Sequence, residues 1–448
     1  TEGHPSIDVS EMNVRRFGKH FADLHYTVER AREIYKYYYY LHYPNDEAEW
    51  GRPLRLSPLY PRLQELGAVF GEKNGWERAN YFEPGKSWRQ AGADQRGWGW
   101  GHPPYFEQVG AEHRAVRERV GLLDMSSFGK LDVQGPDALG LLQRLSNNNV
   151  DKPVGSLTYS QFLNKWGGIE SDVTIARLGE ERFRVITGSA FAANDLGWIT
   201  MHLPKDGSVT VTDVTDDWAV ISLWGPRARD VLTAVTANDV SNAAFPYMTA
   251  QAINIGDVNV WAQRVSYAGE LGWEMYVAAE SAVQVWDTLM VAGQKYNIQS
   301  VGYKALESLR LEKGYRYWSA DITPDENPYE AGLGFAVKLK SGGDFIGREA
   351  LLKVKEQGIR RRLCTLAMAD TSCVIYGGEA VYAHGDLVGR VRSGGYGYTV
   401  GKNIALSYLP VALAKAGTQV AIEIFSETIP AEVAADALYD SRGERLKA

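Results

Sequence analysis

A pattern of strand, Gly-Pro turn and helix occurs twice in the middle of the chain. The first copy covers residues 131–138 and leads into a helical pattern that ends at Val150, and the second covers 221–228 and leads into one that ends at Val240. Counting from Gly135 to Gly225 gives an offset of 90 residues. This period is too long for a solenoid, whose repeats span about 20–50 residues. The repeat therefore predicts two related α+β lobes, which we expect to meet around a shared ligand cavity.

The composition changes after Glu349. Between residues 363 and 423, short apolar runs alternate with glycines, a pattern typical of an antiparallel β module. We expect a small barrel or a jelly-roll-like domain. The segment Ser393–Gly397 is glycine-rich, and it predicts either a turn that faces a ligand channel or a tight hairpin.

The N-terminal region has a different sequence pattern from the rest of the chain. A helical pattern runs from Asp8 to Ile34, and packed helix faces would explain most tyrosines in the run 35–40. Frequent Gly and Pro between residues 51 and 78 indicate an extended connector. No G-x-G-x-x-G stands between a strand and a helix, so a dinucleotide-binding fold has no support in the sequence.

Length and composition narrow the possible functions. A chain of 448 residues is expected to form two or three domains. Its net charge of −7 argues against a nucleic-acid partner, because phosphate binding requires clustered surplus Lys and Arg. No apolar run is long enough to span a membrane, and no secretory leader opens the chain. Cys364 and Cys373 lack metal-type spacing and are expected to be reduced thiols, which predicts a cytoplasmic protein.

The segment 264–277 contains the main candidate residues for a ligand-binding site. Two β-type runs flank a turn with Gly269 and Gly272, so Tyr267 and Glu274 can face one cavity while the glycines admit a flat ligand. A carboxylate accepts two parallel N–H bonds in one plane, and a tyrosine supplies an aromatic wall. The alternative is an ordinary hairpin with an unrelated glutamate.

Three further segments accompany this motif. In the segment 164–172, a Gly-Gly turn leads into a strand with an acidic residue at its start, and the other two segments are 309–314 and 345–351. In this order and at this spacing, the four segments together resemble the glycine-cleavage T-protein family of tetrahydrofolate-dependent aminomethyltransferases. They are most similar to the branch fused behind flavin domains in dimethylglycine and sarcosine dehydrogenases. The resemblance covers nearly the whole chain, although each segment alone is a weak signal.

The resemblance implies a three-lobed ring, in which two related α+β lobes and a C-terminal antiparallel barrel or jelly-roll-like domain surround a central folate channel. It divides the chain into a helical and extended segment at 1–85 that resembles a flavin-domain tail, a folate-binding core at 86–345, and a β domain at 346–448.

It also implies roles for four residues. Glu274 would hold the pterin edge, Tyr267 would pack or hydrogen-bond beside it, and Asp172 would lie near N5 and N10 of tetrahydrofolate. Arg310 would shape the site through an ion pair or hydrogen bonds. Structural alternatives remain open: Asp172 as a turn cap, Arg310 in a helix ion pair, and Tyr267 in the core.

One segment departs from the family pattern. Where classical T-proteins usually have an asparagine at a strand end, this chain has Thr187 and Gly188, as in the dehydrogenase-linked branch. This departure argues against glycine-cleavage activity and against a lipoyl-carrier partner.

Large aromatic residues crowd the segment 88–106. Trp98, Trp100, His102 and Tyr105 would wall a substrate pocket, or would simply cover a hydrophobic core. A leaving group would also need a general acid or a positive neighbour. The candidates that the sequence offers without ranking them are His20, His42, His102 and His113.

These observations predict an enzyme, a tetrahydrofolate-dependent demethylase that moves a methyl group from a small O- or N-methylated compound, such as a methoxyaromatic acid or a methylamine, to N5 of tetrahydrofolate. Two alternatives remain. One is a subunit that makes 5,10-methylenetetrahydrofolate with a separate flavoprotein, and the other is a folate-binding protein without turnover. No metal, nucleic-acid partner or membrane is expected.

Overall fold

The computed structural model describes residues 7–9, 12–40, 43–44, 46–83, 85, 99–341 and 343–448. The chain forms two compact units that each draw on separated segments. The first comprises Thr1–Arg16, Gly129–Val214 and Leu311–Ser441, and the second Phe17–Phe128, Thr215–Arg310 and Arg442–Ala448. Each unit contains one copy of the repeat, which agrees with the predicted pair of α+β lobes.

The first unit contains a five-stranded sheet with strand order β5-β6-β7-β4-β8. Its helices α4 and α5 pack on the sheet through a core that includes Leu142, Ile199, Phe183 and Val185. The elements are β4 (Gly129–Gln134), α4 (Ala138–Leu145), β5 (Leu157–Leu163), β6 (Ile169–Gly179), β7 (Arg182–Thr187), α5 (Ala192–Met201) and β8 (Thr210–Asp213).

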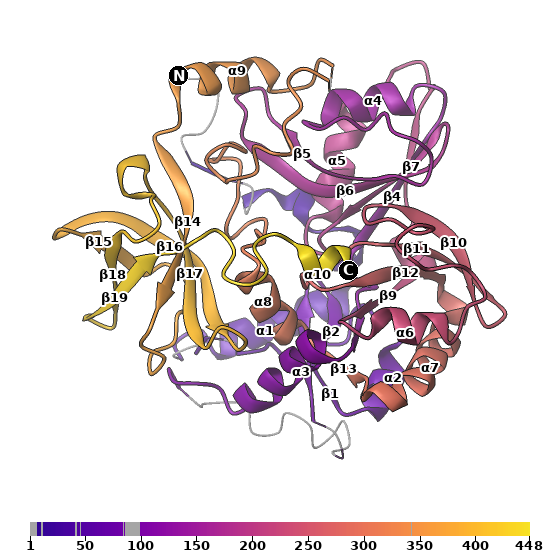
Figure 1. Cartoon of the computed structure of the whole chain (residues 1–448), viewed down its shortest axis with the longest axis horizontal. Helices are drawn as coiled ribbons and strands as arrows, with labels where there is room; N and C mark the ends of the chain where they lie inside the picture. Colours follow the sequence, from indigo (N-terminus) through magenta and orange to yellow (C-terminus); the bar gives the residue numbers. More distant parts are fainter. Residues whose placement is uncertain are drawn as a thin grey trace. The chain divides into compact units, whose positions relative to one another are not determined.

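The same unit also contains a closed six-stranded barrel with strand order β14-β17-β16-β15-β18-β19, drawn in orange to yellow in Figure 1. Pairing of β14 with β19 closes the barrel, which removes the exposed sheet edges. The barrel predicted for the C-terminal region is therefore confirmed. Its elements and the preceding helix are α9 (Arg348–Gln357), β14 (Arg361–Met368), β15 (Ala380–Ala383), β16 (Asp386–Gly397), β17 (Lys402–Pro410), β18 (Gln419–Ile424) and β19 (Glu427–Val433).

The second unit is built on a six-stranded sheet with strand order β10-β11-β12-β9-β3-β13. The helices α6 and α7 contact each other, and together with α2 they bury one face of this sheet (Figure 1). The sheet and its covering helices are α2 (Tyr60–Glu65), β3 (Gly121–Asp124), β9 (Trp218–Trp224), α6 (Ala228–Thr233), β10 (Ala250–Ile255), β11 (Val258–Gln263), β12 (Gly272–Ala278), α7 (Ala282–Gly293) and β13 (Gln299–Ser300). The unit's other elements are α1 (Leu24–Lys36), β1 (Ala68–Lys73), β2 (Trp76–Phe82), α3 (Phe106–Glu118), most of α8 (Tyr303–Glu312) and α10 (Glu444–Lys447).

The two copies of the repeat use their glycines in the same way. Gly135 follows β4 with a φ of 131°, and Gly225 follows β9 with a φ of 133°. A Cβ at these positions would lie 2.1 Å from the Ser208 carbonyl oxygen and 2.5 Å from that of Arg119. Both helices end earlier than predicted, at Leu145 and Thr233. In the first copy a Ser-Asn-Asn-Asn run follows the helix, and such side chains compete for backbone hydrogen bonds.

Three local predictions were wrong. The expected connector at 51–78 contains helix α2 and much of the β1–β2 hairpin, whose turn is the Asn74-Gly75 pair with positive φ at both residues. Ser393–Gly397 lies within strand β16 rather than in a turn, because it pairs with β17, and a Cβ on Gly394 would lie 2.5 Å from Ile375 Cγ2. Most tyrosines of the run 35–40 are not packed on helix faces, because Tyr35 at the end of α1 is exposed, as are Tyr38, Tyr39 and Tyr40 after it.

In the described part of the chain, no helix is both long and apolar enough to cross a membrane. Likewise, no group of three or more His, Cys, Asp or Glu side chains in those residues is placed to hold a metal ion. Both cysteines are free.

Candidate functional site

The sheet of the second unit has one apolar face and one face that carries a polar row. Successive side chains of a strand point to opposite faces. On β12, Trp273 and Met275 enter the core beneath the helices, so Glu274 points to the other face. Its register partners are Gln263 on β11 and Ser222 on β9. Three adjacent strands therefore place a polar side chain at the same level of one face.

Most of this polar row has no hydrogen-bond partner among the residues that the structure describes. The side chain of Gln263 is fully buried, yet neither amide atom has a hydrogen-bond partner among the described residues. The same holds for the buried hydroxyl of Ser266, just beyond β11. Glu274 is 8% exposed and makes no hydrogen bond or ion pair within the described residues, whereas the Ser222 hydroxyl donates to Met125 Sδ. Buried polar groups are normally satisfied, so this row is typical of a site that a polar ligand completes.

Burial also controls the charge of Glu274. Loss of solvent contact raises the pKa of its carboxyl group to about 8. The pKa of nearby Tyr247 is raised as well, first by burial and then by the charge of Glu274. Without ligand, Glu274 is therefore mostly protonated at neutral pH. A ligand that donates N–H groups would favour the ionised form.

The loop between β11 and β12 carries Tyr267 and is fixed by a buried arginine on α3. Arg117 donates to the carbonyl oxygen of Ala268 at 2.7 Å and pairs with Glu270 Oε1 at 3.1 Å. Its other terminal nitrogen donates to the Leu309 carbonyl oxygen at 3.0 Å. One guanidinium thus holds the residue after Tyr267 and the residue before Arg310. Sequence reasoning missed Arg117, because a single arginine in an amphipathic helix has no distinguishing pattern.

Arg310 itself is almost fully buried on α8. Its guanidinium pairs with Glu307, three positions earlier on the same helix. The expected ion pair is present, and it has the helical spacing of the structural alternative. A role for Arg310 in catalysis stays a prediction.

Asp172 lies on β6 of the first unit, opposite Gln161 on β5. Gln161 Nε2 donates to Asp172 Oδ1 at 3.0 Å, and Asn147 Nδ2 donates to Gln161 Oε1 at 2.7 Å. Burial raises the pKa of Asp172 to about 6, while hydrogen bonds from Gln161 and Tyr159 oppose the increase. Asp172 therefore does not cap a turn. It is an oriented carboxyl group that can exchange a proton near neutral pH.

A second carboxyl group, which sequence reasoning missed, lies close enough to Asp172 to interact with it. Asp195 on α5 is fully buried and accepts hydrogen bonds from Ser171 Oγ at 2.6 Å and Thr187 Oγ1 at 2.5 Å. The pKa of Asp195 is raised to about 6, mainly by burial and in part by the charge of Asp172, while the hydrogen bonds from Ser171 and Thr187 oppose the increase. Thr187 had already stood out as a departure from the family pattern, and its contact with Asp195 gives that departure a structural role.

The comparisons with known proteins support the resemblance. Residues 59–341 match the family described as the GCVT N-terminal domain, and residues 361–440 match the glycine cleavage T-protein C-terminal barrel domain. The chain belongs to the glycine cleavage T-protein family. Tetrahydrofolate-dependent one-carbon transfer, the class predicted from the sequence, is the chemistry of this family. Residues 2–57 match a further family, the FAD dependent oxidoreductase central domain.

Similar proteins cover the T-protein region to different extents. An aminomethyltransferase from Symbiobacterium thermophilum is 36% identical over 88% of this chain and 99% of its own length. A 4-methylaminobutanoate oxidase (formaldehyde-forming) from Paenarthrobacter nicotinovorans is 38% identical over 99% of this chain, and human mitochondrial dimethylglycine dehydrogenase is 36% identical over 96%. The chain spans only 53% and 49% of the length of these two relatives.

A solved structure supports the fold assignment. The glycine cleavage system aminomethyltransferase T from Bartonella henselae superposes with a TM-score of 0.72 at 27% sequence identity. The superposition covers 85% of this chain and 97% of that protein. The predicted T-protein fold is thus confirmed.

The aromatic segment of this T-protein family member is only partly described, because Trp98 lies outside the described residues. Tyr105 is buried and stacks on Tyr81 with ring centroids 4.6 Å apart. Trp100 is exposed and meets Tyr43 edge-on, and exposed His102 lies against Phe106. These three side chains have different neighbours, so a shared substrate wall stays a prediction.

The other candidate histidines are dispersed. His113 is fully buried on α3, and His20 lies 3.9 Å from Asp216. His42 lies outside the described residues. Of the four residues with implied roles, Asp172 belongs to the first unit, and Tyr267, Glu274 and Arg310 belong to the second. Within the second unit, Arg117 links the segments that carry Tyr267 and Arg310.

Proposed function

We propose that the chain is a tetrahydrofolate-dependent one-carbon transferase in which the polar row of the second unit's sheet binds the pterin edge. The observation that supports this most strongly is the unsatisfied set Gln263, Ser266 and Glu274. A pterin edge presents adjacent N–H donors and a carbonyl acceptor. A carboxylate can accept the donors, and a carboxamide can both donate and accept, so the ligand would satisfy groups that are otherwise costly to bury.

Asp172 is assigned the proton transfers. Tetrahydrofolate supplies two nitrogens that accept a one-carbon unit, and a proton must leave as the new bond to nitrogen forms. A carboxyl group with a pKa of about 6 is mostly ionised at neutral pH and can take this proton. The hydrogen bond from Gln161 fixes the orientation of Asp172, and Asn147 in turn fixes Gln161.

The one-carbon unit is proposed to arrive at the methylene level, from a methylated amine that a flavin-bearing domain or subunit oxidises. Two observations support this alternative: the match of residues 2–57 to an FAD dependent oxidoreductase domain, and the names of the amine-oxidising relatives. Direct methyl transfer from an O- or N-methylated donor, the first prediction from the sequence, uses the same folate site and remains the second candidate.

The surface of the N-terminal segment fits a flavoprotein partner. Within the matched residues, α1 and the turn after it expose Leu24, Val28, Tyr35 and Tyr39. Large apolar and aromatic side chains that are exposed together are common at interaction sites. We assign this surface to the flavin-bearing domain or subunit.

A cytoplasmic location also stays a prediction.

Product analysis by mass spectrometry tests the proposal. Purified protein would be incubated with tetrahydrofolate and, in separate arms, with formaldehyde, with an amine-oxidising flavoprotein plus its methylated amine, and with methoxyaromatic acids or methylamines alone. Asp172→Asn and Glu274→Gln serve as site variants, and exposed Asp257→Asn on the β10–β11 turn serves as a matched control.

The products distinguish the candidates. Enzyme-dependent 5,10-methylenetetrahydrofolate above the spontaneous rate supports methylene transfer, and 5-methyltetrahydrofolate from a methylated compound alone supports direct demethylation. Both must decrease in the two site variants and persist in the control. No product in any arm would favour a non-catalytic protein, in line with the 35% identical mouse relative named pyruvate dehydrogenase phosphatase regulatory subunit.

A further inference from the structure

A cavity lined by four arginines lies on the barrel of the first unit. Its volume is about 440 Å³, and the arginines that line it are Arg360, Arg361, Arg390 and Arg392. They come from the start of β14 and from β16, and the strand between these two, β17, contributes Tyr408. In a chain with a net charge of −7, such a concentration of positive charge is unexpected.

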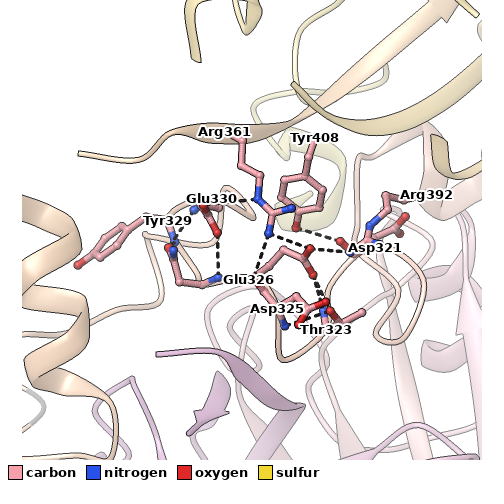
Figure 2. A network of polar contacts seen from close by, with 10 residues as sticks. Asp321, Thr323, Asp325, Glu326, Tyr329, Glu330, Arg361, Arg392 and Tyr408 are labelled. Atoms are coloured by element: carbon pink, nitrogen blue, oxygen red, sulfur yellow. Dashed lines mark hydrogen bonds and ion pairs between the residues drawn. The ribbon is translucent and has the colours of Figure 1, made fainter. Parts of the chain in front are cut away.

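Two of the four arginines, Arg361 and Arg392, belong to the network of polar contacts shown in Figure 2. Arg392 Nη2 lies 2.6 Å from Glu326 Oε1, and Arg361 Nη2 lies 3.2 Å from the same oxygen. Both guanidiniums also lie near the ring of Tyr408, at 5.4 Å and 4.9 Å from its centroid. Tyr408 in turn donates its hydroxyl to the Asp321 carbonyl oxygen.

Glu326 is itself fixed, because its second oxygen accepts from the Thr323 hydroxyl at 2.7 Å (Figure 2). Glu326 is 1% exposed. Glu330 adds a second carboxyl group, 3.6 Å from Arg361 Nε. The network therefore holds Arg361 and Arg392 in place without neutralising the whole arginine cluster.

The other two arginines, Arg360 and Arg390, are exposed. Neither Arg360 nor Arg390 makes an ion pair with any residue in the described part of the chain, and Arg390 donates only to the Gly378 carbonyl oxygen, at 3.2 Å. The residues that line the cavity thus include four arginines and no acidic residue, and the ion pairs with Glu326 and Glu330 involve only Arg361 and Arg392. Apolar side chains, including Leu387 and Val388, line the rest of the cavity.

We propose that this cavity binds a small organic polyanion, a molecule that carries at least two carboxylate or phosphate groups on a compact frame. The cavity volume lies within the usual range for small-molecule sites. Guanidinium groups bind both oxyanions through paired hydrogen bonds, and the apolar lining lowers the local dielectric. The proposal does not depend on the folate site, because all of its residues belong to the barrel and the adjoining loop of the first unit.

Isothermal titration calorimetry with citrate and with pyrophosphate tests the proposal and identifies the preferred oxyanion. The test variant is Arg360→Gln/Arg390→Gln, which removes the two uncompensated charges. The matched control is Arg362→Gln on β14, where the arginine pairs with Asp436 and does not line the cavity. Thermal unfolding monitors folding, and Arg390→Gln alone replaces the double variant if that variant unfolds.

We expect saturable binding of at least one probe, weakened about tenfold or more in the double variant because two charged hydrogen-bond donors are lost. The control should bind as the wild type does. Preference for citrate would indicate a polycarboxylate ligand, and preference for pyrophosphate a phosphorylated one. The proposal is overturned if neither probe binds saturably, if the double variant binds unchanged, or if the control weakens equally.

Discussion

Glu274 shows how one buried carboxyl group links stability to ligand binding. Burial raises its pKa from the ordinary 4.5 to about 8, so the folded protein retains a proton that the unfolded chain loses. Wild-type stability should therefore fall as pH increases through this window. Glu274→Gln removes the ionisable group. We predict nearly equal unfolding temperatures at about pH 5, and a more stable variant at about pH 9 by on the order of 3 kcal/mol.

The same group should make folate binding pH-dependent. Binding to N–H donors favours the ionised carboxylate, so complex formation releases a proton and wild-type affinity should increase as pH rises towards about 8. Titration calorimetry in buffers of different ionisation enthalpy measures this proton release. Glu274→Gln should bind more weakly and lose this contribution. An unchanged pH dependence in the variant would contradict the assignment of Glu274.

Asp172 and Asp195 should affect turnover differently. General acid–base groups contribute about 10²–10⁴ in rate, so Asp172→Asn should lower kcat by about a hundredfold or more. Asp195→Asn keeps the shape but removes a charge that repels Asp172. We expect it to shift the acid limb of the pH–rate profile to lower pH with a smaller loss of kcat. Equal losses with unshifted profiles would contradict the separate roles.

At the residue scale, the sequence indicated the local structure around a candidate residue only where a recognisable motif contained that residue. The position of Glu274 on a strand beside a glycine-containing loop followed from the segment 264–277. Gln263 lies one residue before that segment, and its importance comes from strand register, which the sequence did not specify. Asp195 was missed for a similar reason, because its partners Ser171 and Thr187 are brought to it by tertiary packing.

Among the secondary-structure elements, the loop after β11 depends on α3 through Arg117. We predict that Arg117→Gln raises the KM for tetrahydrofolate by about tenfold, because the loop carbonyl and Glu270 lose a buried charged partner. The exposed Arg114→Gln on the same helix is the matched control. Steady-state kinetics separates KM from kcat. A purely structural role would appear as a lower unfolding temperature with unchanged kinetics in the surviving folded protein.

The Gly-Pro turn of each repeat should tolerate no side chain. Gly225→Ala places a Cβ 2.5 Å from the Arg119 carbonyl oxygen, in addition to an unfavourable φ. Gly256 also has positive φ but faces open space. We expect Gly256→Ala to cost about 1 kcal/mol and Gly225→Ala clearly more, measured by urea unfolding. Equal costs would show that the close approach at Gly225 is unimportant.

The 90-residue repeat made these turns predictable, since the same strand, glycine and helix recur in both lobes. The β1–β2 hairpin was missed because its glycines suggested a connector, although Asn74-Gly75 is a strong turn signal. For β16 the error was the reverse, because its glycines predicted a turn, whereas Gly394 allows close packing within a strand. Composition alone does not distinguish these two uses of glycine.

At the scale of the whole molecule, the sequence predicted two α+β lobes and a C-terminal barrel, and the structure contains both. The arginine cavity on the barrel was not predicted, because Arg360 and Arg392 come together only when β17 pairs between β14 and β16. Residues 2–57 match a flavoprotein domain family and precede the T-protein match at 59–341.

Hydrogen–deuterium exchange with and without tetrahydrofolate tests the central claim most directly, because it reports on the whole chain at once. We predict ligand-dependent protection of peptides that cover β11, β12 and the loop between them, residues 258–278. The protection should be strongly reduced in Glu274→Gln. If tetrahydrofolate binds to the wild type without protecting this segment, the polar row is not the pterin site.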